Sequence, residues 1–142
     1  MVPTRVFPEH GYAPGTGHYI VCCICNTQVQ RDTGLWQSAE YSTFSISDEV
    51  GKYQLTVAGY SGDAGDAMLA TDSQHIADGA KFSTPGSDND QTSSDCAGNN
   101  DRGWWDRACT TSCLNKVGTA QWKLSTDVPH DVQHSHMLVK IK

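Results

Sequence analysis

The amino-acid sequence predicts an α+β domain of short antiparallel strands joined by long loops. Gly, Ser, Thr, Asp and Asn are plentiful, and hydrophobic residues make up only 37% of the 142 residues. Such a composition favours short strands and frequent turns over long helices. Two segments alternate in strand-like fashion, and a third has helical spacing. A polypeptide of this length corresponds to one domain.

The clearest predicted element is an antiparallel hairpin. In residues 41–48 the side chains alternate, which places Phe44 and Ile46 on the inward face of a strand. Residues 48–52 contain a glycine and predict the turn. Residues 53–58 form the second predicted strand, and its inward face is expected to carry three side chains: Tyr53, Leu55 and Val57.

Weaker patterns predict the rest of the molecule. Residues 63–69 have the spacing of a short helix that begins at Gly62 or Asp63, and its apolar face would hold four residues: Ala64, Ala67, Met68 and Leu69. Residues 137–142 predict a closing strand. Residues 1–35 show no periodicity and are predicted to be an irregular, unassigned segment, so the domain is expected to span residues 36–142.

The most polar stretch, residues 86–100, cannot build a core of its own. It is either disordered or held by a metal ion and a disulfide. Asp88 and Asp90 lie two residues apart and could point at one ion. Calcium takes about six to eight oxygen ligands from carboxylates, carbonyls and water. A solvated acidic loop remains the alternative, and the spacing does not match an EF-hand.

The run that follows carries a family resemblance. Residues 82–109 read FSTPGSDNDQTSSDCAGNNDRGWWDRAC, with a Gly-Trp-Trp motif between two cysteines thirteen residues apart. This pattern resembles the fibrinogen C-terminal domain family, which includes the ends of the fibrinogen polypeptides, ficolins, tachylectins and angiopoietins. The resemblance extends over residues 36–142 and includes the run YSGDAGDA at residues 60–67. It implies the distal, calcium-binding half of such a domain, since relatives carry more sequence before this point.

The resemblance implies roles for individual residues. Asp88 and Asp90 would bind Ca²⁺ through their side chains, and Thr92 and Ser94 would offer backbone carbonyls. A disulfide would join Cys96 to Cys109, preceded by a cis peptide at Ala108–Cys109.

The ligand pocket of the family lies beside the calcium site, and in lectin members it takes acetyl groups. The residues expected to line it here are Asn99, Asn100, Cys109 and Thr110. Three positions around the pocket differ from the family pattern. Lectin members commonly carry an aromatic residue at the position of Asn100 and His at that of Thr110, and Asp106 replaces an aromatic residue.

The function implied is calcium-dependent extracellular recognition of carbohydrate or acetylated surface groups, as in innate-immune lectins. The alternatives are a protein-binding adhesion or signalling module and a truncated fragment without function. The ligand and the oligomeric state stay open, with an oligomer among the options. No signal peptide is evident in the sequence. The expectation of secretion therefore depends on the resemblance alone.

Other classes of function find little support. The net charge of −6 and the lack of a Lys/Arg cluster argue against nucleic acid as a partner. The apolar run at residues 19–25 is too short to span a membrane. The sequence contains no recognisable catalytic motif, so we expect no enzymatic activity.

Two groups of cysteine and histidine remain unassigned. Cys22, Cys23 and Cys25 lie close to His10 and His18, which leaves open a zinc site or irregular thiols and disulfides. A second group lies near the C-terminus, where His134 and His136 would share one face of a strand; surface histidines are the simpler interpretation, with His130 among them. Cys113 stands at an Asn position of the family, and its state is open.

Overall fold

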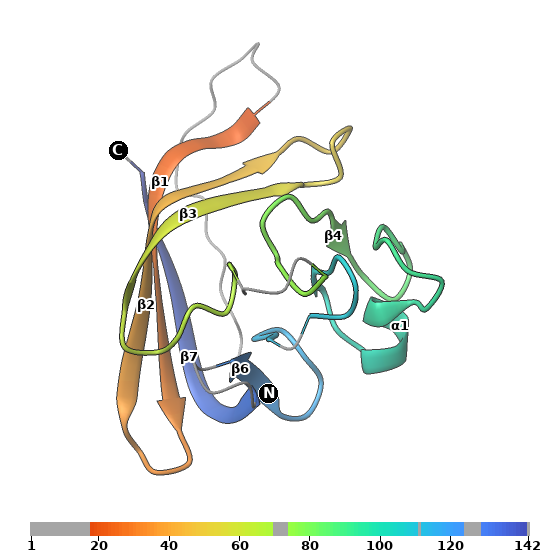
Figure 1. Cartoon of the computed structure of the whole chain (residues 1–142). Coiled ribbons are helices and arrows are strands. Elements are labelled where there is room, and N and C mark those ends of the chain that lie inside the picture. The colour runs from red at the N-terminus through yellow and green to blue at the C-terminus, as the bar shows by residue number, and fades with distance from the viewer. Residues whose placement is uncertain (1–17, 70–73, 111, 124–128, 142) are drawn as a thin grey trace.

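A five-stranded antiparallel sheet dominates the computed structural model, which describes residues 18–69, 74–110, 112–123 and 129–141. The strand order is β3-β2-β1-β7-β6. Figure 1 shows this twisted sheet on one side of the molecule and the loop-rich half with the helix α1 on the other. The sheet strands are β1 (His18–Arg31), β2 (Trp36–Ser47), β3 (Leu55–Gly62), β6 (Ala120–Lys123) and β7 (Pro129–Ile141).

Strand β1 lies at the centre of the sheet and corrects the prediction of an irregular segment over residues 1–35. It pairs with β2 on one side and with β7 on the other. Cys25, Thr27 and Val29 are buried along its inner face, whereas Gln28 between them is exposed. This alternation is masked in the sequence, because Cys and Thr are not read as apolar anchors. Residues 1–17 of the predicted segment lie outside the described residues.

The predicted hairpin is confirmed as β2 and β3. Phe44 pairs with Val57 and Ile46 with Leu55, and the side chains of Phe44, Leu55 and Val57 are buried. The expectation that Tyr53 shares this face is wrong. Tyr53 lies in the turn with φ of 53°, and its side chain is 41% exposed.

Tyr41 is also buried, although simple alternation places it opposite Phe44. The β1–β2 register slips by one residue between the pairs Cys23↔Phe44 and Cys25↔Tyr41. Such a bulge inserts an extra residue and turns the following side chains to the other face. Both aromatic rings therefore reach the same core.

The predicted helix over residues 63–69 is wrong. This segment is irregular, although Ala64, Ala67 and Met68 are buried as expected of its apolar face. Asp66 explains the conformation, because its Oδ1 accepts hydrogen bonds from the Tyr41 hydroxyl at 3.1 Å and from the Leu69 N–H at 3.0 Å. A side chain that bonds to nearby backbone in this way competes with helix formation.

The loop-rich half contains β4 (Phe82–Ser83), the helix α1 (Cys96–Asn100) and β5 (Trp104–Trp105). Trp105 fastens this half to the large sheet. Its ring meets Phe44 and Phe82 edge-on, and its Nε1 donates to the Tyr53 carbonyl at 2.9 Å. Both tryptophans of the Gly-Trp-Trp motif are buried, so they form core.

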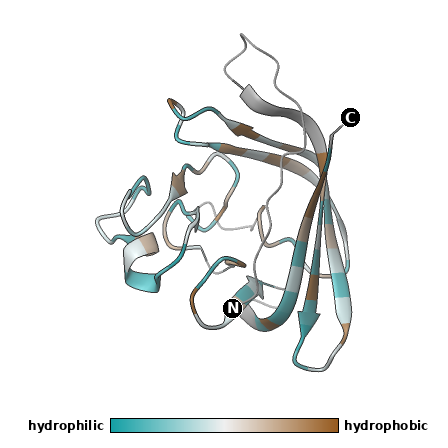
Figure 2. Cartoon of the chain, turned by 180° about the vertical axis from the view of Figure 1, so that it is seen from behind, coloured by the Kyte–Doolittle hydropathy of each residue, from teal (hydrophilic) through white to brown (hydrophobic). Residues whose placement is uncertain are grey.

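The architecture is thus mostly antiparallel strand, and the described residues contain a single helix of five residues. The predicted closing strand over residues 137–142 is confirmed through Ile141 and begins earlier, at Pro129. Figure 2 shows strongly hydrophobic positions along the paired strands and mainly hydrophilic colouring around α1. Within the described part of the protein, no helix has the length and apolarity needed to cross a membrane.

Candidate functional site

Aspartate side chains organise the polar loop at residues 88–96. Asp88 Oδ1 accepts the N–H of Asp90 at 3.0 Å. Asp90 Oδ1 accepts the N–H and the hydroxyl of Thr92 at 2.8 and 3.1 Å, and Asp90 Oδ2 accepts the N–H of Cys96 at 2.9 Å. Bonds from a side chain to backbone two residues later are typical of Asx-turns. The loop is therefore ordered by its own carboxylates.

These contacts favour the ionised form of Asp90. Its partial burial raises the pKa of the carboxyl, but the N–H groups of Cys96 and Thr92, the Thr92 hydroxyl and the hydrogen bond with Asp88 act in the opposite direction. The net result is a pKa below the ordinary value. Asp90 therefore holds a negative charge at neutral pH with all its protein contacts in place.

The loop offers carboxylate and carbonyl oxygens, which are the atoms that a hard cation binds. Asp88 is exposed, and each carboxylate oxygen can accept more than one bond. The Ser94 carbonyl already accepts the Thr92 hydroxyl at 2.7 Å. Among the described residues, no group of three or more His, Cys, Asp or Glu side chains could hold a metal. Calcium bound here would depend on Asp88, Asp90, the carbonyls of Thr92 and Ser94, and water.

A disulfide between Cys96 and Cys109 closes the next part of the polypeptide, as the resemblance implies. The two Cα atoms lie 5.0 Å apart. The cis peptide expected before Cys109 is wrong, because no described peptide bond is cis and Cys109 instead has φ of 55°. The helix α1 starts at Cys96, and Asp95 caps it by accepting the N–H of Gly98 at 2.6 Å.

A buried ion pair contacts Thr110, the residue that follows Cys109. Arg102 Nη2 contacts Asp106 Oδ1 at 2.5 Å, with side chains that are 4% and 0% exposed. The same Oδ1 accepts the N–H and the hydroxyl of Thr110 at 2.8 and 3.0 Å. Arg102 Nη1 in turn donates to the Thr110 carbonyl at 3.2 Å. Thr110 is thereby tied to this pair at three of its polar groups.

The residues predicted to line the ligand pocket differ in access. Asn99 is exposed on α1, and its amide donates to Ser94 Oγ at 3.2 Å. Asn100 is half-buried and donates to the Cys96 carbonyl at 2.8 Å. Cys109 is half-buried, and Thr110 is only 4% exposed. The disulfide joins the helix that carries Asn99 and Asn100 to Cys109. The Thr110 hydroxyl, in contrast, faces Asp106.

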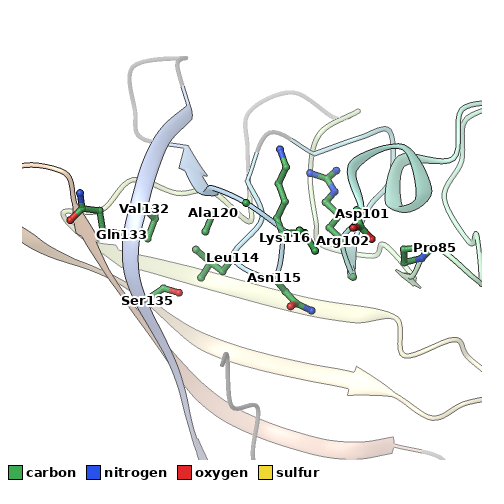
Figure 3. A pocket seen from close by; sticks show the side chains of 13 residues that line it. Pro85, Asp101, Arg102, Leu114, Asn115, Lys116, Ala120, Val132, Gln133 and Ser135 are labelled. Carbon is green, nitrogen blue, oxygen red and sulfur yellow. The ribbon is translucent and has the colours of Figure 1, made fainter. Parts of the chain in front are cut away.

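Sequence reasoning missed a cavity of about 490 Å³ on the other side of Arg102. It lies between β7 and the segment that carries Lys116, and Figure 3 shows Leu114, Ala120 and Val132 gathered there. None of the predicted calcium or ligand residues lines it. No motif marks this site, because its walls come from segments that meet only through long-range pairing.

The remaining cysteines and histidines are placed only in part. Cys25 is buried in β1, and the side chains of Cys22 and Cys23 lie outside the described residues, as do His10 and the side chain of His18. Cys113 is buried, and burial raises the pKa of its free thiol to about 11. His134 and His136 are both placed on β7, where His136 stacks on Trp36. The side chain of His130 lies outside the described residues.

The sheet, the acidic loop, the disulfide that follows it and the buried Gly-Trp-Trp motif together define a fibrinogen-like globular domain. The family model for the C-terminal globular domain of the fibrinogen beta and gamma chains matches residues 23–136. The protein therefore belongs to the fibrinogen C-terminal domain family, a family of recognition modules. The match begins upstream of residue 36, in agreement with the place of β1 in the sheet.

Known proteins of this family resemble the sequence over part of their length. It is 37% identical over 84 residues to fibrinogen-like protein 1 of Rattus norvegicus, and this match covers 56% of the present sequence and 27% of that protein. It is 41% identical over 78 residues to a techylectin-like protein of Phoneutria nigriventer, with 54% of the present sequence and 32% of that protein covered. The sequence thus spans about a third or less of these two relatives.

A solved structure supports the fold independently. The fibrinogen-like globe domain of human ANGPTL2 superposes with a TM-score of 0.73 and 23% identity, and the match covers 85% of the present protein and 59% of that domain. At this level of identity the match speaks for the fold alone.

Proposed function

We propose that this protein is a calcium-stabilised extracellular recognition module that binds carbohydrate or acetylated surface groups. The observation that carries the proposal is the link from Asp90 to Cys109. Asp90 Oδ2 holds the N–H of Cys96, and Cys96 is covalently bonded to Cys109. An ion bound at Asp88 and Asp90 would therefore act directly on the segment that presents the ligand residues.

The ligand surface in this proposal is formed by Asn99, Asn100 and Cys109, and Thr110 supports it from behind through its bonds to Asp106 and Arg102. Asn99 is the most accessible of these, and an amide can both donate to and accept from the acetamido group of a sugar. The resemblance to a techylectin-like protein supports a lectin-like role. Calcium would supply charge and restraint here, and secretion and a role in innate immunity belong to the same proposal.

A protein-binding module is the second candidate, and one observation favours it. The Thr110 hydroxyl is buried and donates to Asp106 at 3.0 Å, so it does not face a ligand in this structure. Shallow backbone and amide contacts of the remaining residues suit a protein surface as well as a sugar.

Binding to immobilised N-acetylated and deacetylated glucosamine oligomers, in calcium and in chelator, tests the proposal. We expect calcium-dependent retention on the acetylated oligomer, loss in Asn99→Ala, and no change in Gln28→Ala, an exposed amide on β1. Equal retention on both oligomers, or retention that is indifferent to Asn99, would reject acetyl recognition. Retention unaffected by chelator would reject the calcium dependence.

A further inference from the structure

We infer that the cavity between β7 and the segment 114–120 binds a small organic anion: a carboxylate carried on a short apolar body. This site is distinct from the surface beside Cys109, because none of Asn99, Asn100, Cys109 and Thr110 lines it. Its volume of about 490 Å³ lies in the range of small-molecule sites.

The walls of the cavity are held by backbone hydrogen bonds from both ends. Arg102 and Lys116 form an isolated antiparallel bridge. Beside it, the Val117 N–H donates to the Asp101 carbonyl at 3.2 Å, and the Gly103 N–H donates to the Asn115 carbonyl at 3.3 Å. At the far end of the segment, Cys113 and Gln121 exchange two bonds of 2.8 and 2.9 Å. A site framed in this way is formed before any ligand arrives.

Apolar side chains supply one side of the cavity. Leu114 and Val132 are buried, and Ala120, which pairs with Val132 across β6 and β7, is half-buried. Figure 3 shows these three residues near one another beside β7, with Ser135 further along the strand. A short alkyl group or a ring would find contact here without leaving a polar group unpaired.

Among the residues that line the cavity, Lys116 supplies the unpaired positive charge, because Arg102 is ion-paired with Asp106. Lys116 lines the cavity and has no ion-pair partner among the described residues. The two terminal nitrogens of Arg102 donate hydrogen bonds to Thr110 and Asp106, but its buried Nε has no acceptor in the described part of the protein. A buried donor without an acceptor is uncommon in proteins and calls for an explanation. This Nε is buried away from solvent, so a carboxylate in the cavity would pair with the ammonium group of Lys116.

One lining carboxylate opposes such a ligand. Asp101 is exposed at the C-cap of α1, with φ of 47°. Its negative charge would repel an anion, so removal of this charge should strengthen the binding of an anionic ligand. Asn tolerates this left-handed conformation well, so Asp101→Asn removes the charge without disturbing the cap.

The experiment titrates the whole 142-residue polypeptide with three six-carbon probes that differ only in the head group: hexanoate, hexan-1-ol and hexylamine. Amide chemical shifts report where each probe binds. We expect hexanoate to perturb the lining residues and to bind more tightly than hexanol, with hexylamine weakest. Lys116→Glu should weaken hexanoate about tenfold and leave hexanol within about twofold. Asp101→Asn should strengthen hexanoate and not hexanol.

Lys81→Glu is the matched control, because Lys81 is exposed and does not line the cavity. Ala120→Leu should fill the cavity and abolish binding of all probes. If that variant does not fold, Lys116→Glu and Asp101→Asn still test whether the cavity binds an anion. Hexylamine binding as well as hexanoate, an equal loss in Lys81→Glu, or shifts confined to residues outside the cavity would overturn the inference. No outcome depends on calcium or on acetylated sugars, so the anion site can be rejected without rejecting the proposed function.

Discussion

Asp106 and Thr110 are bonded to each other twice, through the backbone N–H and the hydroxyl of Thr110 at 2.8 and 3.0 Å. Both residues depart from the family pattern, and the structure shows that the two departures fit one another. A carboxylate at the first position needs donors, and Thr110 and Arg102 provide them to its Oδ1. The segment after the disulfide is thus fixed by a buried polar network.

Removal of Asp106 should be costly, because it leaves the Arg102 charge buried without its partner. We expect Asp106→Ala to lower the free energy of unfolding by about 3–5 kcal/mol, measured by urea denaturation. Thr110→Val, which deletes only the hydroxyl, should cost about 1 kcal/mol. A double variant, Arg102→Met with Asp106→Leu, should recover much of the loss. If Asp106→Ala were as mild as Thr110→Val, the buried pair would not have the role assigned to it.

Tyr41 should contribute through its hydroxyl as well as its ring. The hydroxyl donates to Asp66 at 3.1 Å and accepts the N–H of Met68 at 3.3 Å, and the side chain is fully buried. Tyr41→Phe should therefore cost about 1–3 kcal/mol in urea denaturation, because buried partners lose a bond. Tyr60→Phe is the control, since the Tyr60 hydroxyl also makes two bonds of 3.0 Å but is half-buried. A larger loss for Tyr60 would contradict this ranking.

The disulfide should stabilise the domain mainly through the loop that it closes. Cys96 and Cys109 are separated by 13 residues, and a loop of that length corresponds to about 3 kcal/mol in the loop-entropy model. We expect Cys96→Ala with Cys109→Ala to lose about that amount relative to the oxidised protein. Chemical denaturation of the two proteins measures it, with the other cysteines (Cys22, Cys23, Cys25 and Cys113) replaced by Ala in both to prevent exchange. An unchanged midpoint would mean that the loop is held by its hydrogen bonds alone.

The Cys113 thiol should be unreactive and should make stability fall at alkaline pH. Burial raises its pKa to about 11 from an ordinary value of 9.0. Because the thiol ionises at lower pH in the unfolded protein than in the folded protein, ionisation favours unfolding from about pH 9 upward. The free energy of unfolding therefore falls between pH 9 and 11. Peptide-resolved alkylation at pH 8 should label Cys113 slowly in the folded protein and rapidly in urea. Cys113→Ala should show a smaller loss of stability between pH 9 and 11; an identical loss would contradict the assignment.

The sequence predicts best what depends on neighbouring residues. The Phe44–Val57 hairpin follows from local alternation, and the Asp88–Asp90 spacing and the Cys96–Cys109 separation lie within one short segment. The strand β1 escaped detection because its inward face is Cys25, Thr27 and Val29, which gives little apolar signal.

Features that depend on distant contacts could not be predicted. Residues 63–69 have helical spacing, but Tyr41 draws Asp66 into a different arrangement from 25 residues away. The bulge that turns Tyr41 inward depends on the β1 register. The cavity beside Lys116 exists only because β7 pairs with β6, and no local pattern records that pairing.

Thermal unfolding of the oxidised protein in calcium, in magnesium and in chelator measures whether the folded acidic loop binds calcium. At a calcium concentration about a hundredfold above Kd, binding to the folded state alone would stabilise it by about 2.7 kcal/mol. We predict a cooperative transition that calcium raises and magnesium does not, with the shift lost in Asp88→Asn and kept in Asp101→Asn. Identical transitions in calcium and in chelator, or a calcium shift that persists in Asp88→Asn, would mean that Asp88 and Asp90 do not form a calcium site.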